Sequence, residues 1–317
     1  MLTTFLTTIT QMTRILFFLF AGYMFNRFKL IPRAAETVLS RFTTLLFLPA
    51  LTLYSNIVEC SISSIGTYGQ LFLYGTVFCL VSMAIAILLA KPLGRGDPDR
   101  TSVFRYALTF PNTGAVGTPL ILAFYGISGI FQFNLFLITA VIMTLAWGVP
   151  MLLASNEKPT LKQLLKHIFN LNFDMMLLGM LLGLLGAAQW LPEIALTTLH
   201  DLGSCYVPVA LLMTGFTIAD YEFSDIFSDR TVYWYTLLRL IIIPVAFLAV
   251  LLLLDAPLMV AVMVGLAYAC PCGMYVVVYP AAYGKDCKLG SSMVLMSSVC
   301  SILTVPLIYA LIQQFFA

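Results

Sequence analysis

Two apolar stretches of this chain are interrupted by proline and glycine where a membrane-spanning helix needs unbroken backbone hydrogen bonds. The first interruption lies within the apolar run 106–125 and reads Phe-Pro-Asn-Thr-Gly-Ala-Val-Gly-Thr-Pro, framed by Pro111 and Pro119. Because Pro111 lacks an amide proton and its ring clashes with the preceding turn, a helix breaks or kinks there. Gly114 loosens the backbone further. Broken backbone at membrane depth is tolerated only against protein or a water-filled cavity, so we predict a buried break.

A second interruption of the same kind lies in the other half of the chain, at residues 270–280. Its framing prolines, Pro271 and Pro280, follow Pro111 and Pro119 by 160 and 161 residues. Two interrupted helices at corresponding positions of two halves are the best sequence indication of a transporter's binding site. Proline and glycine are also frequent in membrane helices, so packing alone is the alternative interpretation of each kink.

The composition places the chain in a membrane. Hydrophobic residues make up 61% of 317 residues and charged residues 9%, with a mean hydropathy of +0.99. These values predict a polytopic protein surrounded by lipid bilayer. The net charge of +2 indicates no nucleic-acid partner. The seven cysteines are odd in number, and we interpret them as small apolar residues rather than disulfides or metal ligands; no cofactor is expected.

A spanning helix needs about 20 apolar residues, and the sequence offers about ten such runs. Pro49 and Pro208 lie 159 residues apart, close to the offset of the breaks, which indicates a duplication of five helices. We expect a first repeat over 1–154, a cytoplasmic amphipathic linker over 155–170 and a second repeat over 171–317. The expected spans are residues 5–28, 36–56, 66–90, 106–125, 130–153, 173–188, 194–219, 232–254, a broken ninth span around 270–280, and 291–315.

The distribution of basic residues predicts the orientation. Of the 16 Lys and Arg residues, 14 lie in or beside odd-numbered loops, and basic loops face the cytoplasm. Both termini are therefore expected outside the cytoplasm, and five spans per half make the halves inverted repeats. The first five residues carry no basic residue, so we expect the first apolar run to be a span rather than a cleaved signal peptide.

The residues of the two breaks favour an anionic or neutral polar ligand. Asn112, Thr113 and Thr118 offer hydrogen-bonding groups from the first break, and Cys272 and Tyr275 offer them from the second. Neither break contains Asp, Glu or His, which disfavours a carboxylate-based cation site.

The helix ends at the breaks point to the same kind of ligand. The half-helices that begin after Gly114 and Gly273 are expected to direct their amino ends at the breaks, and such ends attract anions.

Three charged residues inside or at the start of spans are further candidates, because ionisable residues in spans are costly. Arg14 is expected either to contact the ligand or to line an outward vestibule. Arg239 is a candidate coupling residue, or it snorkels to the cytoplasmic face or pairs with Asp220. Asp174 is a candidate coupling residue or an ordinary helix cap.

The sequence shows no catalytic constellation, since neither His167 nor His200 faces an evident nucleophile and no nucleotide-binding motif is present. We therefore expect a protein that is not an enzyme.

The chain resembles the auxin efflux carrier family, which comprises plant hormone exporters and bacterial relatives that include malonate-transporter-like proteins. The resemblance covers essentially the whole chain. It rests on Leu-Pro-Ala-Leu at 48–51, the two break motifs, and Arg239 followed by Pro244.

The resemblance implies a particular architecture and site. It implies ten helices in an inverted five-plus-five repeat, crossing broken helices four and nine, elevator-like movement and a homodimer. It also implies substrate contacts at Asn112 and around Pro271 and Gly273. Cys272 departs from the more polar residue that some members carry.

These observations together predict a secondary transporter that exports small organic anions, and carboxylates in particular, across a bacterial inner membrane. A sodium- or proton-coupled importer resembling the bile-acid symporters is one alternative. A membrane sensor that binds its ligand without transport is another.

Overall fold

The computed structural model describes residues 2–32, 34–153, 170–219, 229–282 and 286–317, and in these ranges it consists of helices without strands. The chain forms two compact units, and each takes segments from both halves of the sequence. The first unit comprises Met1–Gln70, Gly114–Leu135 and Phe169–Asp220. The second unit comprises Leu71–Thr113, Phe136–Ile168 and Tyr221–Ala317.

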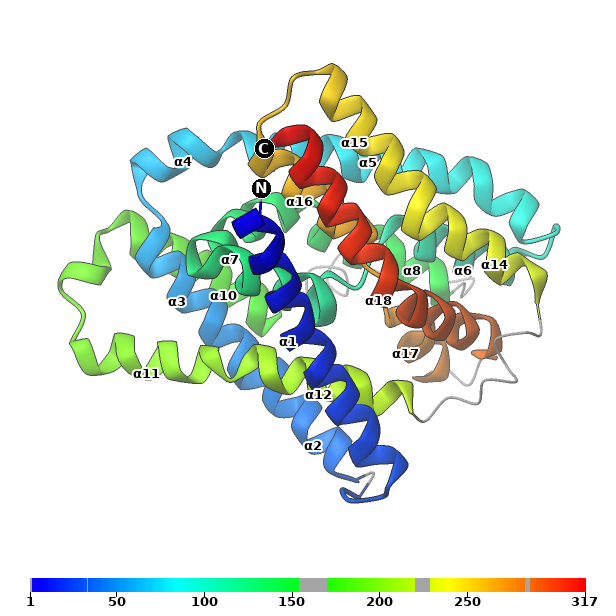
Figure 1. Ribbon diagram of the computed structural model, residues 1–317, viewed down its shortest axis with the longest axis horizontal. Coiled ribbons are helices and arrows are strands. Elements are labelled where there is room, and N and C mark those ends of the chain that lie inside the picture. The colour runs from blue at the N-terminus through cyan, green and yellow to red at the C-terminus, as the bar shows by residue number, and fades with distance from the viewer. Residues whose placement is uncertain (1, 33, 154–169, 220–228, 283–285) are drawn as a thin grey trace. The chain divides into compact units, whose positions relative to one another are not determined.

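The first unit is a layer of packed helices in which α1 lies against α12 and α3 against both α10 and α11 (Figure 1). Its elements are α1 (Leu2–Arg27), α2 (Ala34–Phe42), the π-helical turn η1 (Thr43–Phe47), α3 (Leu48–Glu59), α4 (Ile62–Tyr68), the first part of α7 (Thr118–Met143), α10 (Leu171–Leu184), α11 (Glu193–Ser204) and α12 (Tyr206–Ile218).

Glycines bring α1 and α12 into close backbone contact. A Cβ at Gly22 would collide with the backbone of Leu212, and a Cβ at Gly215 would collide with the backbone of Leu19. Helices in membranes associate through such small residues, since close van der Waals packing replaces the hydrophobic effect there.

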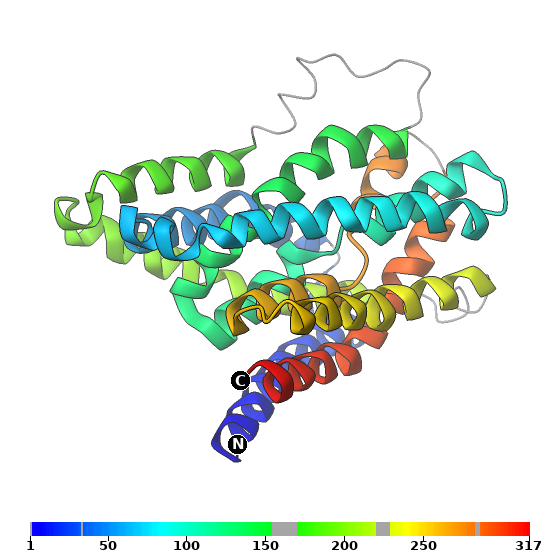
Figure 2. The same cartoon turned by 90° about the horizontal axis from the view of Figure 1, so that it is seen from above.

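The second unit is built around α16, which lies against α15 and α18 (Figure 2). All of its residues from 260 to 269 are buried, as expected for a helix that is apolar on every side. The elements of the unit are α5 (Gln70–Leu93), α6 (Pro98–Thr109), the end of α7, η3 (Thr144–Gly148), α8 (Val149–Leu153), α14 (Arg230–Leu237), η5 (Leu238–Ile242), α15 (Ile243–Leu253), α16 (Leu258–Ala269), α17 (Tyr275–Ala282) and α18 (Lys288–Phe316).

Prolines inside the helical spans are accommodated by widened turns. A proline removes one amide donor and displaces the carbonyl four residues before it, and π-helical turns relieve that clash. In each of four cases the π-helical turn ends two residues before the proline. The turns are η1, η2 (Thr113–Gly117), η3 and η5, and the prolines are Pro49, Pro119, Pro150 and Pro244.

Helices occupy every expected span within the described residues, and the prediction of an all-α polytopic membrane protein is confirmed. Gly126 has a positive φ of 63° inside α7 and separates the fourth expected span from the fifth. The expected amphipathic linker lies outside the described residues, and the inverted ten-span layout stays a prediction. Six described stretches are long and apolar enough to cross a membrane: Ala34–Glu59, Gln70–Leu93, Thr113–Leu152, Glu193–Ile218, Arg230–Leu253 and Lys288–Phe316.

The close approach of α1 and α12 predicts that Gly215→Val destabilises the protein. Overpacking of this kind costs about 1–3 kcal/mol, because the new side chain has to push the Leu19 backbone away. The measurement is the thermal unfolding temperature of the purified protein in detergent. Gly66→Val is the matched control, since nothing lies within 4 Å of a Cβ at Gly66. Equal unfolding temperatures for the two variants would contradict the predicted close packing.

Candidate functional site

The two predicted breaks meet in the second unit and pair through their backbones. After α6 ends at Thr109 and α16 ends at Ala269, the chain forms a short antiparallel bridge between Pro111 and Cys272. The Asn112 amide donates to the Pro271 carbonyl at 2.9 Å, and the Gly273 amide donates to the Phe110 carbonyl at 3.3 Å. Helices therefore end before Pro111 and Pro271, and we call residues 110–112 and 270–274 the paired breaks.

Local sequence explains why the chain extends at these two places. A residue before proline is pushed out of the helical region, and Phe110 and Cys270 have ψ angles of 107° and 147°. Gly273 allows the two chains to approach, because a Cβ there would lie 2.9 Å from the Phe110 carbonyl oxygen. Each break thus contains one proline that ends a helix. The second break also contains Gly273, which lets the backbone of the first break approach closely.

Aromatic side chains surround the paired breaks. The ring of Tyr106 lies 5.1 Å from that of Phe110 and 6.4 Å from that of Tyr275. Trp147 meets Phe110 from the end of the fifth expected span, at 6.1 Å. Tyr106 is buried whereas Tyr275 is 39% exposed, so the aromatic cluster extends from the core of the unit to its surface.

The candidate ligand-binding residues differ in accessibility. Asn112 and Thr113 are half-buried and Tyr275 is exposed. Cys272 is 0% exposed, and its amide donates to the Ser297 hydroxyl of α18 at 3.0 Å. The buried Cys272 side chain serves the packing of the break, and its amide already has an acceptor.

The remaining candidates of the first break belong to the first unit. The Gly114 carbonyl accepts a hydrogen bond from the Tyr206 hydroxyl at 2.5 Å, and Thr118 is buried. Helical structure resumes at Thr113 in the first break and at Tyr275 in the second. Pro119 and Pro280 lie within these continuing helices.

Arg239 lies fully buried beside the first break. It is 0% exposed, and its Nη1 donates to the Leu108 carbonyl at 2.9 Å in the last turn of α6. Its guanidinium carbon lies 5.6 Å from the centre of the Tyr268 ring. The expected snorkelling to the cytoplasmic face is therefore wrong, because the guanidinium satisfies a carbonyl that the break leaves without an amide. Asp220, its expected partner, lies outside the described residues.

Several polar residues that sequence reasoning missed complete the backbone bonding around the breaks. The Tyr235 hydroxyl donates to the Ala107 carbonyl at 3.3 Å, and the Ser82 hydroxyl donates to the Leu108 carbonyl at 3.2 Å. The only signal for Ser82, Tyr235 and Ser297 in the sequence is a polar group inside an apolar span, which occurs in many helices for other reasons.

The other charged candidates lie in the first unit. Arg14 is an exposed residue of α1. Asp174 is half-buried in the first turn of α10, whose cap is formed by Asn170. An acid in this position interacts favourably with the helix dipole, but the cap itself is Asn170.

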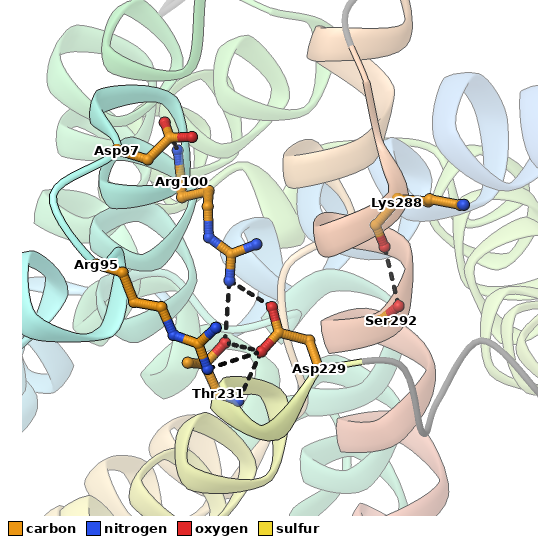
Figure 3. A network of polar contacts seen from close by, with 7 residues as sticks. All are labelled: Arg95, Asp97, Arg100, Asp229, Thr231, Lys288 and Ser292. Carbon is orange, nitrogen blue, oxygen red and sulfur yellow. Dashed lines mark hydrogen bonds and ion pairs between the residues drawn. The ribbon is translucent and has the colours of Figure 1, made fainter.

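At the end of the second unit where α6 and α14 begin, an ion pair holds the two helices together (Figure 3). Asp229 caps α14 by accepting from the Thr231 amide and also pairs with the Arg100 guanidinium of α6. Arg95 lies 3.7 Å from the same carboxylate. Partial burial acts to raise the pKa of Asp229, but hydrogen bonds from Thr231 and Arg100 outweigh it and lower the pKa to about 2.

We predict that Asp229→Asn lowers stability at neutral pH by about 1 kcal/mol, the upper range for a partly exposed pair. The folded-state pKa of Asp229 is depressed from 3.8 to about 2. The ion pair therefore stabilises the folded protein fully at pH values above the ordinary pKa of aspartate. The stability difference between wild type and variant should therefore disappear as the pH falls from about 4 to about 2. Unfolding temperatures across this pH range test the prediction.

Asp97→Asn is the matched control for this experiment. Asp97 caps α6 by accepting from the Asp99 and Arg100 amides, and it makes no ion pair within the described part of the chain. Asparagine is as good a cap as aspartate, so the control should unfold like wild type. A pH-independent difference between wild type and Asp229→Asn would contradict the role of the charge.

Comparison with known proteins agrees with this architecture. No curated protein sequence matches the chain closely enough to count as a relative. The sequence profile of a family described as membrane transport protein, which includes the auxin efflux carriers, matches residues 7–309. This match covers nearly the whole chain and confirms the resemblance drawn from the break motifs. The chain belongs to this family of membrane transport proteins.

Proposed function

We propose that the protein is a secondary transporter that exports small organic anions, with the paired breaks as its substrate site. The observation that carries the proposal is the antiparallel pairing of residues 110–112 with residues 270–274 inside an otherwise helical unit. Irregular backbone at membrane depth is characteristic of transporter sites. Asn112 and Thr113 are half-buried there and Tyr275 is exposed, so these three side chains are the proposed substrate contacts.

The proposed ligand is an anion because the breaks offer donors and contain no acid. Helical structure begins at Thr113 and at Tyr275 directly after the breaks, and the first amides of a helix attract negative groups. Small carboxylates fit this combination of amide, hydroxyl and phenol donors. An anion that leaves a negative-inside cell gains about 2.3 kcal/mol per charge for each 100 mV, so export needs no coupled ion.

The proposed layout is ten spans in two inverted repeats in a bacterial inner membrane, with both termini outside the cytoplasm. The segregation of 14 of 16 basic residues to odd-numbered loops supports it. Because each compact unit draws on both sequence halves, we propose elevator-type alternating access. One unit would carry the substrate while the other stays fixed in a homodimer. A ligand shifts such an equilibrium only through differential affinity for its states.

Exchange of a labelled dicarboxylate across proteoliposomes that hold the purified protein tests the transport function. We expect counterflow without an imposed sodium or proton gradient. Counterflow that requires such a gradient would favour the coupled importer, and binding without any exchange would favour the sensor. Either result would contradict the proposed function.

Asn112→Ala should lower the exchange rate at limiting substrate about 10-fold or more, because a hydrogen bond to a charged group contributes about 1.5–3 kcal/mol. The backbone amide of Asn112, which makes the bond to Pro271, is unchanged in this variant, so folding should be preserved. Thr67→Ala, on the exposed surface of α4, is the control and should exchange like wild type. Normal exchange by a well-folded Asn112→Ala protein would exclude its side chain from the site.

A further inference from the structure

The helix amino ends at the paired breaks offer amide donors to an anion, but the helix ends as a set bring almost no net charge. Two helices end there, α6 at Thr109 and α16 at Ala269, and helical structure begins there at Thr113 and Tyr275. An amino end carries roughly +0.5 charge and a carboxyl end roughly −0.5. Two of each nearly cancel, so a preference that increases with the charge of the solute needs another charge.

The carboxyl end of α6 is bonded by an arginine, whereas the end of α16 is bonded by neutral groups. Arg239 and Ser82 donate to the Leu108 carbonyl, and Tyr235 donates to the Ala107 carbonyl. At α16, the Cys270 thiol donates to the Leu266 carbonyl at 3.2 Å, and the Cys270 amide donates to the Ala267 carbonyl at 3.3 Å. Arg239 thus adds one full positive charge at the carboxyl ends of the two helices, since its guanidinium also lies 5.6 Å from the ring of Tyr268 in the last turn of α16.

Among the described residues, no carboxylate pairs with that positive charge. Arg239 forms no ion pair with any described residue, and its Nε and Nη2 are buried without a hydrogen-bond partner there. The Leu108 carbonyl and the Tyr268 ring compensate the charge only in part. An ionisable residue that is kept inside a membrane span at such cost is a candidate functional residue.

The charge is also close to the proposed substrate contacts. Leu108, which Arg239 contacts, precedes Asn112 by four residues, and four extended residues span at most about 14 Å. Arg239 itself is 0% exposed, so a solute at the half-buried Asn112 would sense its field without touching it.

We propose that Arg239 is a positioning residue that gives the paired breaks their net positive charge and thereby their preference for anions. The inference rests on the proposed function and deepens it, because the preference must increase with the charge of the substrate. At a distance of about 14 Å and an effective dielectric constant of about 20, one unit of ligand charge changes affinity on the order of 10-fold. Removal of the Arg239 charge should therefore weaken the binding of a dicarboxylate about 10-fold more than the binding of a monocarboxylate.

The test compares butyrate and succinate, which share a carbon number and differ by one charge, in counterflow with each labelled acid. Arg239→Met, which removes the charge, should raise the apparent KM for succinate about 10-fold more than the KM for butyrate. Arg239→Lys should keep the wild-type ratio of the two KM values, even if both change. Tyr235→Phe is the matched control, since it removes a neutral bond from the neighbouring Ala107 carbonyl, and it should change both KM values equally.

Ser82→Asp provides a second variant in case Arg239→Met does not fold. It places a carboxylate next to the guanidinium, at the Leu108 carbonyl, and should change the KM ratio in the same direction as Arg239→Met. Equal KM changes for both acids in the folded charge variants would overturn the inference and leave the proposed function standing. Wild-type protein that exchanges neither these acids nor other C2–C6 carboxylates would overturn both.

Discussion

The structure depends on a backbone pairing that a lipid environment makes obligatory. A helix interrupted inside a bilayer exposes amide and carbonyl groups that lipid cannot satisfy. Here each interruption satisfies the other, since the amides of Asn112 and Gly273 donate across to the carbonyls of Pro271 and Phe110. Either break alone would leave backbone groups without hydrogen bonds, so each break depends on the presence of the other. The glycine at 273 meets this requirement, because it lets the backbone approach the Phe110 carbonyl.

The pairing leaves the last carbonyls of α6 without amides, and side chains from distant helices take their place. Tyr235, Arg239 and Ser82 donate to two carbonyls of α6, while Ser297 accepts from the Cys272 amide. Buried polar groups in such a network are valuable only when their partners are present. These four polar residues of the apolar spans are therefore explained by the backbone groups of the breaks that they hydrogen-bond, rather than by contact with solvent.

The sequence was sufficient to predict the helices and the breaks, because prolines and apolar runs act locally. Pro111 and Pro271 end their helices by steric rules that hold in any surroundings. Arg239 shows where such reasoning ends. Snorkelling was one of the roles that the sequence left open for it, yet its guanidinium bonds a carbonyl 131 residues away in the sequence. Cys272 shows the same limit, since its burial follows from packing against α18, which no local pattern reveals.

The chemical nature of arginine explains why this residue serves beside the break. A guanidinium is planar, remains charged and is more weakly hydrated than an ammonium group. It can therefore bond the Leu108 carbonyl, lie over the Tyr268 ring and keep its charge while fully buried. The cost of that arrangement is that Nε and Nη2 find no hydrogen-bond partner in the part of the chain that the structure describes. Natural proteins accept such local instability where function requires it. The paired backbones create irregular structure that a solute can approach, and a charge held behind them determines the sign of the solute that is attracted.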